Sequence, residues 1–198
     1  MLNVKALAEL LTRNRDERLC RRWCLITPNG TLLAYSQPTD IKDLRKQVAI
    51  TALTWQEHTV QSNAPKADAD QVGMNPVQAS RLRTLIIESE TSNVLVRQLQ
   101  PQLLLMLEGG IPPRKQTFEP RITAEGPDGE PLHDAPPADS ALGSFVSSQM
   151  DSSAGEGNPP TSVLGLHRMK LDAMASAITS DFEQTGFKMP DETANKFF

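Results

Sequence analysis

The chain has 198 residues, of which 38% are hydrophobic and 22% are charged, and its net charge is −4 with a pI near 5.4. These values are typical of soluble globular proteins, and they favour neither nucleic acid nor an anionic membrane as a partner. Because no run of about 18 apolar residues could span a bilayer, and the start MLNVKALAELL lacks a cleavage-like site, we expect a cytosolic protein.

The start of the chain predicts a helix followed by a β-hairpin. Apolar residues recur at helical spacing over about residues 2–14, namely Val4, Leu7, Ala8 and Leu11. The stretch PNGTLLAYS, residues 28–36, predicts a two-residue turn at Asn29 and Gly30 and then a strand, because both turn positions tolerate a positive φ. Residues 19–27 are rich in Leu, Trp, Cys and Ile, and we expect them to form the first strand of this hairpin.

A second helix is predicted to begin at Thr39 or Asp40, either of which can cap it, and to extend to about residue 58. One side of it carries an apolar stripe made of Ile41, Leu44, Val48, Ala52 and Trp55. Further apolar residues lie progressively away from this stripe, so that one sheet cannot cover them all: Ala49, Ile50 and Leu53. They are either isolated exposed side chains, which are common, or a second contact surface. We favour the contact surface, because the three share one flank.

Three strands and a long polar segment follow the second helix. Residues 62–80 are polar and contain two prolines and a glycine, which suits a connection. Strands fit at about residues 82–89, 93–99 and 102–107, separated by ETS and by a proline. The expected sheet therefore has five strands, all antiparallel.

The remainder of the chain consists of two parts that differ in composition. Residues 109–162 hold 9 of the 15 prolines and 7 of the 11 glycines, and we expect a disordered insertion there, because so little apolar surface cannot offset the entropy of ordering. Helical periodicity returns over residues 163–187, and this broad apolar helix is expected to pack back on the sheet. Residues 1–108 and 163–187 would form one α+β domain, followed by a flexible tail over residues 188–198.

No residues with the spacing of a catalytic or metal site are evident. Cys20 and Cys24 lie four apart on one predicted strand, roughly 13 Å at about 3.3 Å per residue, which is too far for a disulfide. We interpret them as reduced packing thiols, in preference to a metal or redox pair. His58, His133 and His167 show no paired spacing, and no phosphate loop or nucleophile elbow is present. We expect no enzyme activity, no cofactor and no metal.

A cluster of arginines lies between the first helix and the hairpin, at Arg13, Arg15, Arg18, Arg21 and Arg22. Asp16 and Glu17 interrupt it, and no aromatic platform accompanies it beyond Trp23, so we favour a solvated loop over a nucleic-acid patch. A basic edge that faces an acidic protein partner is also possible.

The order helix, hairpin, helix, three strands, helix resembles the roadblock/dynein light chain family. The resemblance rests on KALAELL in the first helix, NGTLLAYS in the second strand and LGLHRMKLDAMASAI in the last helix, and it covers residues 1–108 and 163–187. Within the family, the chain resembles the roadblock subunit of the Ragulator complex. The resemblance implies two helices on one face of the sheet and one on the other, with the second helix packing beside its counterpart in another subunit while the third strands join two sheets.

The resemblance also implies a function and partners. We expect a non-enzymatic scaffold that pairs with a second roadblock-domain protein, joins a lipid-anchored subunit at the lysosomal or vacuolar surface, and presents Rag-type GTPases for TOR complex 1 signalling. The expected interface residues are Ala49, Ile50, Leu53, Leu85 and Ile87. Two alternatives remain, namely a homodimeric motor light chain and a regulator of a small GTPase. The regulator would need an arginine that reaches the nucleotide, for which Arg45 and Arg97 lie on predicted ordered elements.

Overall fold

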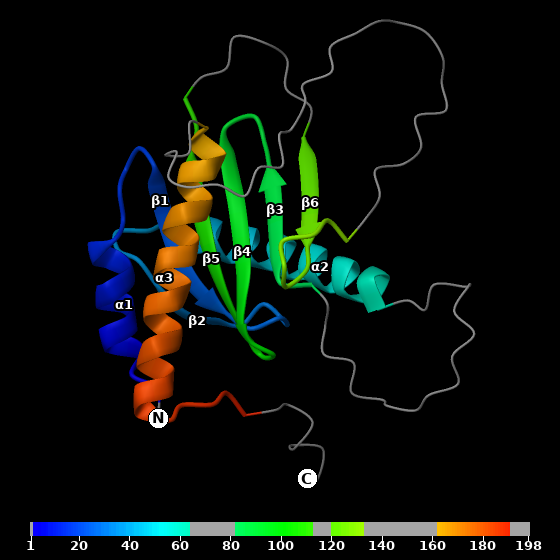
Figure 1. Cartoon of the computed structure of the whole chain (residues 1–198). Coiled ribbons are helices and arrows are strands. Elements are labelled where there is room, and N and C mark those ends of the chain that lie inside the picture. Colours follow the sequence, from blue (N-terminus) through cyan, green and yellow to red (C-terminus); the bar gives the residue numbers. More distant parts are fainter. Residues whose placement is uncertain (1, 64–81, 113–119, 133–161, 191–198) are drawn as a thin grey trace, which may run out of the picture.

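The computed structural model describes residues 2–63, 82–112, 120–132 and 162–190, and Figure 1 shows their arrangement. Within these ranges the chain forms, in order, α1 (Val4–Arg13), β1 (Cys20–Ile26), β2 (Leu32–Tyr35), α2 (Ile41–Asn63), β3 (Thr84–Glu88), β4 (Ser92–Gln100), β5 (Leu103–Gly110), β6 (Arg121–Glu125) and α3 (Val163–Thr185). Every helix and strand expected from the sequence is present. α2 continues to Asn63, beyond its predicted end near residue 58.

The strands form one antiparallel sheet in the order β2-β1-β5-β4-β3-β6. In Figure 1, α1 and α3 lie in front of this sheet and α2 lies behind it. The predicted α+β class, with two helices on one face and one on the other, is therefore confirmed. The predicted number of five strands is wrong, because β6 adds a sixth strand beside β3.

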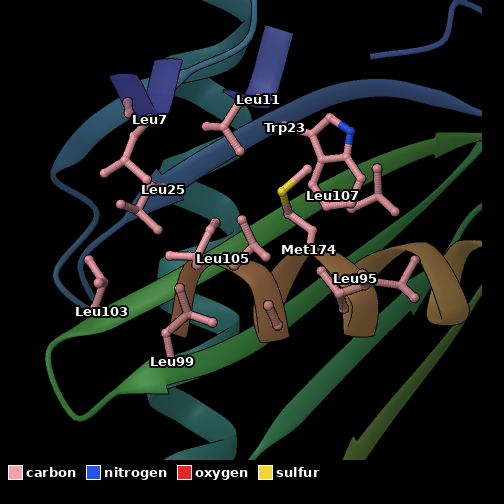
Figure 2. Packing of buried hydrophobic residues seen from close by; sticks show 14 of the residues in the cluster. Leu7, Leu11, Trp23, Leu25, Leu95, Leu99, Leu103, Leu105, Leu107 and Met174 are labelled. Carbon is pink, nitrogen blue, oxygen red and sulfur yellow. The ribbon is translucent and has the colours of Figure 1, made fainter. Parts of the chain in front are cut away.

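The face under α1 and α3 holds the larger core. Because successive side chains of a strand point to opposite faces, alternate residues of β1, β4 and β5 reach this layer. Figure 2 shows Leu7 and Leu11 of α1 and Met174 of α3 packing against side chains from the three strands, namely Trp23, Leu25, Leu95, Leu99, Leu103, Leu105 and Leu107. The Nε1 of Trp23 donates a hydrogen bond to the carbonyl of Asn14 at 3.0 Å, so the indole ties the end of α1 to the sheet.

α3 packs back on the sheet, as its apolar periodicity predicts. Ser162 caps it, with Oγ accepting a hydrogen bond from the amide of Gly165 at 3.0 Å. It ends at Gly186, whose φ of 63° is the left-handed value that glycine adopts without strain. Beyond this cap, the ring of Phe187 lies against that of Phe182, with centroids 4.9 Å apart. The helix is held to the sheet along its length, since its buried residues run from His167 to Phe182.

The turn between β1 and β2 differs from the expected two-residue turn. The amide of Gly30 donates to the carbonyl of Thr27, and the amide of Thr27 donates to the carbonyl of Thr31, each at 2.9 Å. The loop therefore has three residues, 28–30, and Gly30 takes a positive φ of 85°. Pro28 accounts for the difference, since its fixed φ suits the first central position of an ordinary turn that is followed by a left-handed glycine.

Part of the predicted insertion belongs to the sheet, contrary to expectation. Gly109 and Gly110 end β5, and residues 121–125 form β6, which pairs with β3. The pairing gives the main-chain groups of β3 a partner that an open edge would lack. The remaining residues of the predicted insertion, 113–119 and 133–161, lie outside the described residues, as do most of the predicted connection and the tail after residue 190.

Candidate partner interface

The inner side of α2 forms the second core of the domain. The amide of Lys42 donates to Oδ1 of Asp40 at 2.8 Å, so Asp40, one of the two expected residues, caps the helix. The apolar stripe predicted for this helix packs on β1, β3, β4 and β5, and four of its members are buried, namely Leu44, Val48, Ala52 and Trp55. The helix is therefore fixed by one side, and this determines which residues the other side presents.

The outer side of α2 carries a stripe of exposed apolar residues, which we name the α2 stripe: Ala49, Ile50, Leu53 and Val60. The side chains of Ile50, Leu53 and Val60 are 64%, 66% and 72% exposed. At 100° per residue, Leu53 lies directly opposite Leu44 on the helix, so no residue of the sheet beneath can reach it. Sequence analysis missed Val60, because the helix was ended two residues before it.

Charged residues of opposite sign share the outer side of α2 with the stripe. Lys46 and Glu57 are both exposed, and on a helical wheel both fall within about 40° of Leu53. Ala49, Ile50 and Leu53 therefore lie between a positive charge toward the start of the helix and a negative charge toward its end, and Val60 lies beyond the negative charge. Such a pattern is complementary to itself in an antiparallel pairing.

The structure separates the two expected interface residues of β3 from those of α2. Leu85 is fully buried beneath α2, and Ile87 is half-buried in the same layer. β3 is paired on both sides, with β4 and with β6. The expectation that Leu85 is open to a partner is therefore wrong, because that residue belongs to the core, and β3 has no open edge.

The arginines considered for a nucleotide or a polyanion are largely engaged within the domain. Nη1 of Arg97 donates to Oδ1 of Asp172 at 2.7 Å, between β4 and α3. Of the arginine cluster, Nε of Arg15 donates to the carbonyl of Arg21 at 2.8 Å, and Arg22 pairs with Glu108 at 3.2 Å. These contacts give the side chains a structural role. Arg45 is exposed on α2, outside the α2 stripe.

The two cysteines are free and buried, as expected of packing thiols. Burial raises the pKa of both thiols, that of Cys24 to about 12, so this thiol stays protonated at neutral pH. No group of three or more potential metal-binding side chains occurs among the described residues. No helix in the described ranges has the length and apolar character needed to cross a bilayer.

His167 lies buried in α3 over the paired residues Asn93 and Gly109 of β4 and β5. Its Nδ1 is 3.3 Å from Nδ2 of Asn93, and burial lowers the pKa of the imidazole. The side chain fills a space that only glycine at position 109 leaves open. His167 is therefore a core histidine that fixes the start of α3 on the sheet, and no local pattern in the sequence indicates this role.

Comparison with known proteins identifies the fold. No protein-family model matches the chain, and no curated protein matches its sequence. Among solved structures, MglB of Myxococcus xanthus matches over 96% of this chain and 97% of its own, with 12% identity and a TM-score of 0.50. Two structures of the roadblock/LC7 domain of Streptomyces avermitilis match 52% and 55% of this chain and 78% and 79% of theirs, with 12% and 11% identity and TM-scores of 0.37 and 0.40. The fold is of the roadblock type, with a sixth strand.

Proposed function

We propose that the chain is a non-enzymatic scaffold that pairs with a second roadblock-fold protein through the α2 stripe. The observation that carries the proposal is the position of the stripe, on the side of α2 that faces away from the sheet. Single exposed apolar residues are common. Three large ones, Ile50, Leu53 and Val60, lie on the same outward side of one helix, and exposed apolar side chains that gather on one side are typical of protein–protein interfaces.

The order of residues on the α2 stripe supports an antiparallel pairing of two such helices. The register that sets Ile50 of one copy opposite Leu53 of the other also sets Lys46 opposite Glu57. In this register Ile50 and Leu53 meet each other and Lys46 meets Glu57, whereas Ala49 falls opposite Thr54 and Val60 opposite Asp43. A second copy of this chain satisfies this pattern, and so does a different roadblock-fold protein with a similar stripe.

The cellular role that we propose follows the resemblance to the roadblock subunit of the Ragulator complex. The pair would join a lipid-anchored subunit, lie on the lysosomal or vacuolar surface, and present Rag-type GTPases to TOR complex 1. Regulation of the catalytic cycle of a small GTPase has less support, since one of the two arginines considered for it, Arg97, is paired with Asp172 within the domain, which leaves the exposed Arg45. Pull-down from cells with wild-type and Leu53→Asp baits tests this role, and loss of a second roadblock protein and of Rag-type GTPases from the variant is expected.

The pairing itself is tested with three aspartate variants. Leu53→Asp is expected to keep the fold and to weaken pairing by at least about 100-fold, because burying a leucine contributes about 1.5–3 kcal/mol and a symmetric pair loses two. Val48→Asp is expected to unfold the domain, since it sets an unpaired charge in the core beneath α2. Met169→Asp on α3 is the matched control, because Met169 is apolar, 48% exposed and outside the stripe.

Sedimentation velocity and circular dichroism distinguish the outcomes. Wild type and Met169→Asp should sediment as pairs, and Leu53→Asp as a folded monomer. Equal association of Leu53→Asp and Met169→Asp would show that the α2 stripe is not the interface.

A further inference from the structure

β6 lies at the edge of the sheet and pairs with β3 along its whole length. The register sets Thr84 opposite Glu125, Ile86 opposite Thr123 and Glu88 opposite Arg121. On the other side of β3, the amide of Gln98 in β4 donates to the carbonyl of Arg83 at 3.0 Å. Without β6, every second residue of β3 would present an unpaired N–H and C=O to solvent, which is the template that a further strand binds.

The side chains across this pairing match one another. Glu88 lies opposite Arg121, Ile87 opposite Ile122, and Leu85 opposite the small Ala124. Opposite charges and apolar pairs that face each other across two strands stabilise the pairing. β6 is therefore suited to this edge by its sequence as well as by its position.

The end of β6 is anchored to the rest of the domain. Nη1 and Nη2 of Arg168 in α3 donate to the two carboxylate oxygens of Glu125, Nη1 at 2.9 Å, and Glu125 is buried. The amide of Leu132 donates to the carbonyl of Ala124 at 2.9 Å, and both side chains pack in the core beneath α2. The chain thus turns back along the outer side of β6 and covers its last residues.

The beginning of β6 has no such anchor among the described residues. Arg121 is exposed, and the side chain of Ile122 is 49% exposed. Only the pairing with Ile87 and Glu88 holds this half of the strand among the contacts that the structure describes. Among the described residues, the first half of β6 is therefore held by fewer contacts than its end.

A bare β3 would be complementary to a second β3. In an antiparallel pairing centred on Ile86, Leu85 of one copy meets Ile87 of the other, and Thr84 meets Glu88. We propose that β6 closes the edge of β3 against strand pairing with a second copy of this chain. The inference rests on the proposed function, since it restricts pairing of the intact chain to the α2 stripe.

Two proline variants of β6 distinguish the loss of its pairing with β3 from the general effect of a proline in the strand. The carbonyl of Ala124 accepts a hydrogen bond from Leu132 on the side of β6 that faces away from β3. Because the main-chain groups of successive strand residues point to opposite sides, the N–H of Thr123 faces β3 and the N–H of Ile122 faces away from it. Thr123→Pro removes the donor that β3 needs. Ile122→Pro removes a donor at the outer edge, where proline is tolerated, and is the matched control.

Both variants are made in the Leu53→Asp background, in which pairing through the α2 stripe is abolished. Leu53→Asp and Leu53→Asp/Ile122→Pro are expected to remain monomers at all concentrations. Leu53→Asp/Thr123→Pro is expected to form a dimer as concentration rises, with amide protection of Ile86 and Glu88 lost at low concentration and regained in the dimer. A Thr123→Pro variant that stays monomeric at high concentration would overturn the inference.

The two proposals fail in different ways. If Leu53→Asp alone still pairs, the proposed use of the α2 stripe is wrong, and the effect of Thr123→Pro is then read as a further step from pair to tetramer. If Thr123→Pro does not fold, Arg121→Glu takes its place, because it sets like charges opposite each other at an exposed position. More dimer for Arg121→Glu than for Arg121→Glu/Glu88→Arg is expected, and equal amounts would contradict the inference.

Discussion

Gly109→Ala tests how α3 is seated on the sheet. A Cβ at position 109 would lie 2.5 Å from Nδ1 of His167 and closer still to Cε1 and Nε2. Carbon atoms in contact lie about 3.5–4.0 Å apart, so the ring would have to move by about 1 Å or more. The ring is buried and contacts Asn93 at 3.3 Å, so this movement disturbs both the packing and a buried polar contact.

The expected cost can be worked out from these contacts. Overpacking of a core costs about 1–3 kcal/mol, and the contact with Asn93 contributes about 1 kcal/mol. Replacing a strand glycine by alanine returns about 0.5–1 kcal/mol. Gly109→Ala should therefore lower the free energy of unfolding by about 1–3.5 kcal/mol. In a His167→Ala background, where the ring is absent, the same change should be neutral or stabilising by about 0.5–1 kcal/mol.

A double-mutant cycle measured by urea unfolding checks this prediction. The coupling free energy between positions 109 and 167 should be about 1–4.5 kcal/mol, above the few tenths expected of independent sites. If Gly109→Ala is neutral in the wild type, or costs the same in both backgrounds, the ring does not occupy the space over Gly109. The arrangement described for the start of α3 would then be wrong.

Two further predictions concern pH and membranes. Burial lowers the pKa of His167 in the folded state below its usual 6.5. Between this lowered pKa and pH 6.5, the unfolded state therefore binds more protons than the folded state. The free energy of unfolding should fall as the pH drops below about 6.5, with a slope of at most about 1.4 kcal/mol per pH unit. Urea midpoints at pH 7.5 and 5.5 should show this fall in the wild type and a smaller one in His167→Gln; equal falls would contradict it. The purified chain should remain in the supernatant with acidic liposomes, because the apolar face of α3 is buried on its own sheet, and cosedimentation without any partner would contradict this.

Much of the fold could be predicted, because most of its elements follow from local patterns. The apolar periodicities of α1, α2 and α3 each match the face that the structure buries, and the strand runs match β1 to β5. The position of the hairpin is confirmed, but its loop has three residues and not two, because the fixed φ of Pro28 imposes a different turn. These errors concern turn chemistry and the ends of elements, not their existence.

β6 could not be predicted, because its stability does not come from its own sequence. RITAE is short, and it lies in a segment rich in proline, glycine and acidic residues. Composition describes the average of such a segment, whereas five residues suffice to complete a sheet edge. The ion pair between Glu125 and Arg168 joins residues that are 43 positions apart, and no local pattern indicates such a contact.

The candidate interface was predicted only where it depends on one helix. The outward position of Ile50 and Leu53 follows from the period of α2 and the side that it buries, both of which the sequence contains. The position of Leu85 depends on the neighbours of β3, and alternation along a strand cannot show which neighbour lies at an edge. Once β6 occupies that edge, α2 and β3 no longer form one surface. The α2 stripe must then hold a partner without help from the sheet, and this is why a single charge at Leu53 is expected to abolish pairing.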